Sequence, residues 1–202
     1  MTEVGYAVEG SSDEPVAERL IAHAGCSPRK ILTAGGKNRL DPRIPGYNRS
    51  GQHRPWLVLR DLDHDDEGSC VGDVVRELAN GGVASRMALR LAVRTVESWM
   101  LADVAGFSSF FRVSRSRIPC NPDMLMDPKK ALVDACRRST TRAIREAMVP
   151  RERSGRVVGP EYAATIREFA GSTWDLERAM HASPSLARAA TCIRRLVETG
   201  KW

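Results

Sequence analysis

The chain has 202 residues, of which 42% are hydrophobic and 28% are charged, and its mean hydropathy is -0.33. These values are typical of a folded globular protein and exclude a disordered or fibrous chain. The formal net charge of +6 favours an anionic partner. No apolar run approaches the ~20 residues that span a bilayer, so we expect no membrane partner.

Cysteine usage and the amino-terminal residues bear on the compartment. The five cysteines are widely spaced, without a Cys-x-x-Cys pair. This pattern favours a reducing environment and argues against a zinc cluster. The segment Met1–Val4 has neither a basic region nor a long apolar stretch, so we expect no signal peptide. The predicted location is the cytoplasm.

Short apolar runs alternate with amphipathic segments in the first half of the chain. Strands are predicted over Val4–Val8, over Arg29–Thr33, from Trp56 to the acids near position 61, and over Met87–Val93. Helices are predicted from Ser12 or Asp13 to near Gly25, over Val71–Ala79 and over Thr95–Val104. Residues 38–55 contain several prolines and glycines and are predicted to be mostly irregular. This order predicts an α/β fold, with a mostly parallel central sheet and helices on both faces.

The second half is predicted to be mainly helical. Phe107–Val113 is interpreted as a short strand or as an aromatic plug on the core. A helix should begin at Asp127 and Pro128, because aspartate caps helices and proline is tolerated in the first turn. Residues 151–159 are predicted to form a basic loop. Further helices are predicted over Glu161–Ala170 and Ser185–Thr199. We therefore divide the chain into an α/β core, 1–105, and a helical extension packed on it, 106–202, which together form one compact unit.

The acid-rich end of the third predicted strand is the most informative segment. Residues 56–66 read WLVLRDLDHDD, a buried run that ends in alternating carboxylates. Successive side chains of a strand point to opposite faces, so Asp61 and Asp63 would share one face about 7 Å apart. Two carboxylates this close repel each other unless a cation lies between them, and a divalent cation is the usual one. The alternative interpretation is a solvated turn.

Three more acids follow predicted strands. Glu9 comes directly after the first strand, and Asp13 lies four residues further on, where helix capping is the alternative role. Glu97 follows the fourth strand, where favourable first-turn helix electrostatics is the alternative. Strand ends of a parallel sheet meet at one edge, and oxygen ligands suit Mg²⁺ or Mn²⁺. The predicted metal ligands are Glu9, Asp13, Asp61, Asp63 and Glu97.

Basic residues lie near the same strand ends and on the segment between the second and third strands. Lysine and arginine offset the charge of phosphate oxygens. The candidate phosphate-binding residues are Lys37, Arg39, Arg43, Arg60 and Arg94. Lys37 is also a candidate for offsetting transition-state charge, so the candidate catalytic residues are Glu9, Asp61, Asp63, Lys37 and Glu97. Arginines between positions 137 and 156 form a candidate strip for a nucleic-acid backbone, although each alone suits a solvated surface.

Two of these motifs together resemble the Toprim domain of topoisomerases, bacterial primases and overcoming-lysogenization-defect (OLD) nucleases. They are VEGSSD at 8–13 and LRDLD at 59–63. The resemblance implies metal binding by Glu9, Asp61 and Asp63, with Asp13 in the place of an additional nuclease acid. A wider pattern, including residues 94–103 and 127–129, is similar to an uncharacterised bacterial Toprim-like family often encoded beside an ATPase.

The resemblance implies a Mg²⁺- or Mn²⁺-dependent nuclease that contacts the backbone of DNA or RNA, within an ATPase-linked antiviral defence system. The chain lacks a Walker-type phosphate loop, so the ATPase would be a separate subunit. One alternative is a non-catalytic subunit that binds nucleic acid or nucleotide for a partner ATPase. Another is a phosphatase with an aspartyl nucleophile. The residues leave open the substrate, one metal ion or two, and a homo-oligomeric state.

Overall fold

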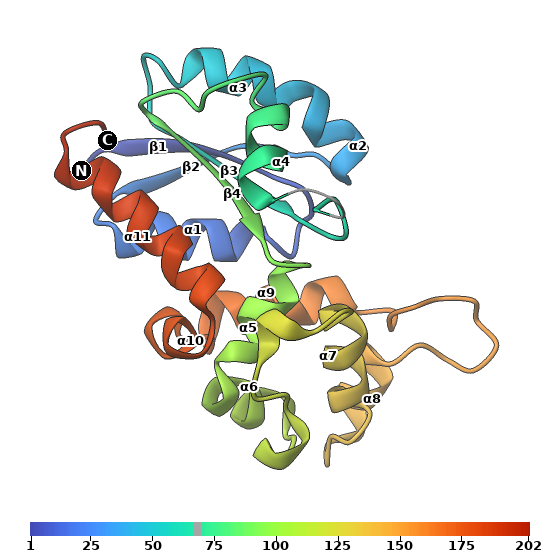
Figure 1. Ribbon diagram of the computed structural model, residues 1–202. Coiled ribbons are helices and arrows are strands. Elements are labelled where there is room, and N and C mark those ends of the chain that lie inside the picture. Colours follow the sequence, from blue (N-terminus) through green and yellow to red (C-terminus); the bar gives the residue numbers. More distant parts are fainter. Residues whose placement is uncertain (67–69) are drawn as a thin grey trace.

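The computed structural model describes residues 1–66 and 70–202, and a four-stranded parallel sheet lies at its centre (Figure 1). The strands are β1 (Glu3–Val8), β2 (Ser27–Thr33), β3 (Trp56–Asp61) and β4 (Met87–Ala92), in the order β2-β1-β3-β4. Val8 of β1 lies opposite Leu59 of β3, and Asp61 lies opposite Ala92 of β4. Every residue of β3 is buried, which explains its continuous apolar run.

Helices cover both faces of the sheet, so the predicted α/β fold is confirmed. On one face, Tyr6, Val8 and Leu59 pack with α1 (Glu14–His23) and α11 (Pro184–Glu198) in the main core. On the other face, Ala7 and Val58 pack with α3 (Ile44–Ser50), and α4 (Val71–Leu78) covers the β4 side. The alternation of neighbouring residues between the two faces is the period of a strand.

The segment before β3 is helical, so the prediction of a mostly irregular 38–55 is wrong. It contains α2 (Lys37–Leu40), a 3-10 turn (Asp41–Arg43) and α3. Pro42 and Pro45 both lie in first turns, where a missing N–H group removes no helical hydrogen bond. Leu40 and Ile44 are fully buried against the sheet. Burial of these side chains outweighs the local proline and glycine content.

The second half is helical, as predicted. Its helices are α5 (Val96–Ala102), α6 (Val104–Phe111), α7 (Pro128–Cys136), α8 (Arg142–Met148), α9 (Tyr162–Ser172) and α10 (Leu176–Ala182), followed by α11. Because α6 covers most of Phe107–Val113, the strand interpretation of that segment is wrong and the aromatic plug is correct. Phe107 and Phe111 are fully buried, and the ring centroids of Phe111 and Phe169 are 5.1 Å apart.

The extension returns to the sheet after forming a separate helical layer past the end of β4 (Figure 1). Both α9 and α11 contact α1. Arg19 of α1 donates to the carbonyl oxygen of Ala170 at 2.6 Å, and the Trp99 indole donates to Ser185 Oγ at 2.7 Å. Core and extension therefore share one set of packing contacts. No helix in residues 1–66 or 70–202 has both the length and the hydropathy to cross a membrane.

We expect Phe169→Ala to lower the free energy of unfolding by about 3–5 kcal/mol, because it removes a buried ring of the aromatic plug. Denaturant unfolding followed by tryptophan fluorescence and far-UV circular dichroism measures this change, and the two transitions should coincide. Glu168→Ala, an exposed neighbour on α9, is the control and should change stability by less than about 0.5 kcal/mol. Two separate transitions would contradict a single cooperative unit.

Candidate active site at the carboxyl edge of the sheet

Four of the predicted acids lie together at the carboxyl edge of the sheet. Glu9 follows β1 and Asp61 ends the adjacent strand β3, while Asp13 precedes α1 and Glu97 lies in the first turn of α5. The pKa of Asp61 is raised well above its usual value, first by burial and then by the charges of Asp13, Glu97 and Glu9. These four carboxyl groups therefore form one electrostatic unit, here called the acid cluster.

Burial distinguishes the acid cluster from a solvated acidic turn. The residues Asp13, Asp61 and Glu97 are 3%, 8% and 1% exposed. Burial raises the pKa of Asp13 to about 7, and the charges of Glu97 and Glu9 add to this effect. Burial and the charge of Asp63 also raise the pKa of Glu9. At neutral pH Asp13 is thus held between its charged and protonated states, as is common at functional sites.

Backbone groups next to the strand ends hold two of these carboxylates. The N–H group of Gly10 donates to Asp13 Oδ2 at 2.7 Å, and Ser12 Oγ donates to Asp13 Oδ1 at 3.0 Å. The N–H group of Val96 donates to Asp61 Oδ1 at 2.9 Å. Although Asp13 occupies the cap position of α1, its side chain makes no capping hydrogen bond with the helix. Its carboxylate is instead directed by the turn that also positions Glu9.

Two residues of the helical extension reach the acid cluster, and the sequence did not single out either as a site residue. Lys129 Nζ, in the first turn of α7, lies 3.5 Å from Glu97 Oε1. The Tyr162 hydroxyl, at the start of α9, donates to the same oxygen at 2.8 Å. The charge of Glu97, followed by those of Asp61 and Asp13, raises the pKa of Lys129 although burial opposes it. Lys129 is therefore the cation that faces the acid cluster.

Asp63 lies at the rim of the site, not inside it. Its side chain is 37% exposed and Oδ2 pairs with Lys37 Nζ at 3.0 Å. Lys37 begins α2 and also pairs with Asp65 at 3.0 Å. Burial lowers the pKa of Lys37, but these two carboxylates outweigh it and the net shift is upward. The predicted phosphate contacts Arg39 and Arg43 are exposed, and their side chains make no hydrogen bond or ion pair within the described part of the chain.

Arg60 and Arg94 hold the backbone of the acid-rich segment. Arg60 is buried, donates to both carboxylate oxygens of Asp41 at 2.8 Å, and donates to the Asp61 carbonyl oxygen at 2.7 Å. Arg94 Nη1 donates to the carbonyl oxygen of Asp63 at 2.7 Å. Both arginines, predicted as phosphate contacts, thus use donors within the protein, where a bidentate pair fixes geometry as well as charge.

The backbone is strained where β3 and β4 lead into the site. Asp63 and Arg94 have left-handed φ angles of 51° and 60°. The Asp63 N–H group donates to the Arg94 carbonyl oxygen at 2.8 Å, and Arg94 returns a side-chain bond to Asp63. A left-handed conformation costs a residue other than glycine about 1 kcal/mol. The two reciprocal hydrogen bonds hold this conformation and keep Asp63 at the rim.

The donor chemistry of the acid cluster fits a hard divalent cation. Glu9 Oε2 and Glu97 Oε2 are buried and have no hydrogen-bond partner among the described residues. Such oxygens are costly when unpaired and are the ligands that Mg²⁺ and Mn²⁺ prefer. Within residues 1–66 and 70–202, no group of three or more His, Cys, Asp or Glu side chains is arranged to hold a metal ion. The two unpartnered oxygens are therefore candidate ligands by their chemistry alone, and in this structure the ammonium of Lys129 lies beside Glu97.

No family model, no curated protein and no solved structure matches this chain. The arguments for a function therefore come from the acid cluster, from the cations around it and from the motifs that carry them.

We expect Asp13→Asn to stabilise the metal-free protein at pH 8. The folded protein takes up a proton on Asp13 as the pH falls through about 7, whereas the unfolded chain does so only near pH 4. Lowering the pH from 8 to 5.5 should therefore raise the free energy of unfolding of the wild type, by on the order of 1 kcal/mol, through this group. The variant should lack that gain.

Denaturant unfolding in a chelator at both pH values measures the effect. Glu198→Gln removes an exposed carboxylate from α11 and should keep the pH dependence of the wild type. If Asp13→Asn keeps the same pH dependence too, the electrostatic description of the acid cluster is incorrect.

Proposed function

We propose that the protein is a Toprim-like, metal-dependent nuclease that cleaves the phosphodiester backbone of nucleic acid. The acid cluster is the observation that carries this proposal. Glu9 and Asp61 follow adjacent parallel strands, Glu97 joins them from the next strand end, and two of the buried carboxylate oxygens have no partner in the described chain. The adjacency of β1 and β3 is what the two Toprim-like motifs require.

Each carboxylate has a role that follows from its place. Glu9, Asp61 and Glu97 would hold Mg²⁺ or Mn²⁺, with Asp13 behind them and Asp63 at the rim. When bound, such an ion stabilises the attacking and leaving oxygens of a phosphodiester and lowers the pKa of its water. The Val96 N–H group fixes one oxygen of Asp61, which leaves the other free to bind.

Cations on two sides complete the site. Lys129 approaches the acid cluster from α7, where its ammonium offsets negative charge that develops on a phosphate oxygen. Lys37 does the same at the rim, from its position between Asp63 and Asp65. Tyr162 donates to Glu97 and remains protonated because burial, followed by Glu97, raises its pKa well above its usual value. It is therefore a positioning residue.

One observation favours a second function, that of a non-catalytic binding subunit. In the described residues the acids are not arranged around a metal position, and Lys129 already pairs with Glu97. The acid cluster would then be an ion-pair network, and the protein would bind nucleic acid or nucleotide for a partner ATPase. Metal binding by calorimetry, without turnover of DNA or RNA in the presence of that ATPase, favours this alternative.

The setting of the activity is also a proposal. These 202 residues contain no Walker-type loop, and we propose that the ATPase that the family resemblance implies acts as a separate subunit. An antiviral role and a cytoplasmic location come from the same resemblance and from the cysteine pattern.

The double variant Asp61→Asn and Asp63→Asn should abolish Mn²⁺-dependent cleavage, because it removes the charge of two predicted ligands. Its melting temperature should stay near or above that of the wild type, since repulsion is relieved and the amide oxygen introduced at position 61 can still accept from the Val96 N–H group. Mn²⁺ should raise the melting temperature of the wild type alone. Glu168→Gln with Glu198→Gln removes two exposed carboxylates and should keep full cleavage. Cleavage that persists in the double variant would remove the proposal.

Lys129→Met should reduce kcat by about 100-fold, while Mn²⁺ binding is retained or tightened. Methionine keeps much of the side-chain length but removes the charge that faces the acid cluster. Single-turnover cleavage and calorimetry separate the two effects. Lys201→Met, at an exposed position, is the control. Unchanged cleavage by Lys129→Met would show that this ammonium has no part in the reaction.

A further inference from the structure

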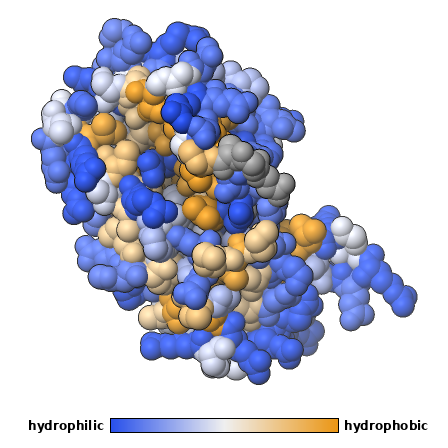
Figure 2. All heavy atoms as spheres, viewed as in Figure 1, coloured by the Kyte–Doolittle hydropathy of each residue, from blue (hydrophilic) through white to orange (hydrophobic). Residues whose placement is uncertain are grey.

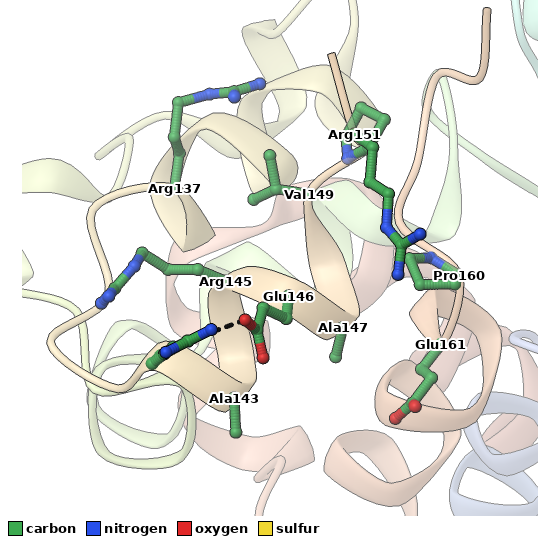
Figure 3. A pocket seen from close by; sticks show the side chains of 11 residues that line it. Arg137, Ala143, Arg145, Glu146, Ala147, Val149, Arg151, Pro160 and Glu161 are labelled. Atoms are coloured by element: carbon green, nitrogen blue, oxygen red, sulfur yellow. Dashed lines mark hydrogen bonds and ion pairs between the residues drawn. The ribbon is translucent and has the colours of Figure 1, made fainter. Parts of the chain in front are cut away.

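A large open cleft lies in the helical extension, outside the acid cluster. It has a volume of about 770 Å³ and is bordered by the end of α7, by α8 and by residues 149–161. Figure 3 shows that its side chains come from these three separate segments. Its basic lining residues are all arginines, namely Arg137, Arg142, Arg145 and Arg151, and lysine is absent among the described residues that line it. We call this feature the basic cleft.

Part of the positive charge of the basic cleft is not neutralised within the protein. Arg142 pairs with Glu146 at 2.8 Å, and Arg145 donates to a backbone carbonyl oxygen. Arg137 has only a long ion pair, at 3.8 Å. Arg151 is exposed, and its side chain has no hydrogen-bond or ion-pair partner in the described chain. Two carboxylates, Glu146 and Glu161, also line the cleft, but four arginines leave its lining positive, so it presents guanidinium groups that can bind an external anion.

Two smaller hollows share lining residues with the basic cleft. A hollow of about 320 Å³ shares Arg137 with it and is lined by Lys129, the residue that contacts Glu97 of the acid cluster. A hollow of about 370 Å³ shares Arg151 with it and is lined by Arg156. Basic side chains thus continue from the acid cluster, through the basic cleft, to the loop between α8 and α9. That loop projects from the molecule, and its surface is mostly hydrophilic (Figures 1 and 2).

We propose that the basic cleft binds the phosphodiester backbone of a nucleic acid and leads it to Lys129 and the acid cluster, an inference that rests on the proposed function. A nucleic-acid strand carries one charge about every 3.4 Å along a duplex, so it matches a row of cations better than a small anion does. The guanidinium fork fits phosphate oxygens in a bidentate manner, which a lysine does not. Contacts of this kind bind without reading base sequence.

The double variant Arg151→Ala and Arg156→Ala tests the inference. Both residues are exposed and their side chains make no hydrogen bond or ion pair in the described chain, so the fold should not change. Fluorescence anisotropy in a chelator measures binding of labelled single-stranded DNA, duplex DNA and RNA of one length, without cleavage. For each nucleic acid that the wild type binds, we expect the affinity of the double variant to be about tenfold weaker. For a single strand, the slope of log K against log salt should fall by about 1.4, or 0.7 for each lost phosphate contact.

Arg188→Ala with Arg194→Ala is the matched control. It removes the same charge from exposed positions on α11, which lies away from α8 (Figure 1), and should leave affinity and salt slope unchanged. The reversal Arg151→Glu with Arg156→Glu should abolish binding. Equal weakening by both alanine pairs would overturn the inference in favour of diffuse electrostatic attraction. If the wild type binds neither single-stranded DNA, duplex DNA nor RNA, the inference is overturned as well.

Two further outcomes separate this inference from others. Polyglutamate that competes as well as an oligonucleotide of equal charge would overturn the assignment to a phosphodiester backbone. The Asp61→Asn and Asp63→Asn double variant should still bind in chelator. Binding that depends on Arg151 and Arg156, with no cleavage under any condition, supports the cleft and removes the nuclease. Cleavage that does not depend on these arginines, at any salt concentration, supports the nuclease and removes the cleft.

Discussion

Burial of like charges at one edge of the sheet is the constraint on which the rest of this structure depends. Asp61 and Glu97 are almost fully buried, and burial, followed by the charges of Asp13 and Glu97, raises the pKa of Asp61. Removing carboxylates from water costs several kcal/mol for each ion unless other groups offset it. Here the offsetting groups come from outside the sheet, from Lys129 of α7 and Tyr162 of α9. The helical extension is thus part of the site, because it supplies the ammonium and the hydroxyl group that contact Glu97.

The acid-rich segment after β3 supplies both a buried ligand candidate and the structure that holds it. Asp61 points into the acid cluster, whereas Asp65 pairs with Lys37 and with buried Arg60, and Asp66 pairs with Arg94. Exposed ion pairs contribute little to stability. The bidentate bond of buried Arg60 with Asp41 differs, because it ties the start of this segment to the helical region before β3. The four acids of residues 61–66 therefore fall into two groups. Asp61 faces the acid cluster, and the other three lie nearer the surface.

The sequence predicted the parts of the site that depend on strand order. Carboxyl ends of parallel strands meet at one edge, so Glu9, Asp61 and Glu97 could be placed together from short apolar runs alone. Lys129 and Tyr162 could not, because a helix start reveals where a helix begins but not which way it packs. The helices of residues 37–50 were missed for a related reason. In the sequence, Pro42 and Pro45 look like residues that end helices. The structure shows that both lie in first turns, where proline is tolerated, and that the apolar side chains of these helices are buried against the sheet.

The features of this protein that lower its folding stability are concentrated where the site is proposed. Of the four buried side-chain atoms without a hydrogen-bond partner in the described chain, three belong to Glu9, Thr95 and Glu97. Left-handed Asp63 and Arg94 lie at the same edge. In residues 1–66 and 70–202 the other left-handed residues besides glycine are Asn80, Arg112 and Arg153, at helix ends or in a loop. Costs of about 1 kcal/mol each are large against a typical net stability of about 5–15 kcal/mol. Asparagine or glycine at positions 63 and 94 would remove much of the cost of the left-handed backbone. Stability alone therefore does not account for aspartate and arginine at these positions. The unpartnered oxygens of Glu9 and Glu97 are the groups to which the divalent cation of the proposed function would bind.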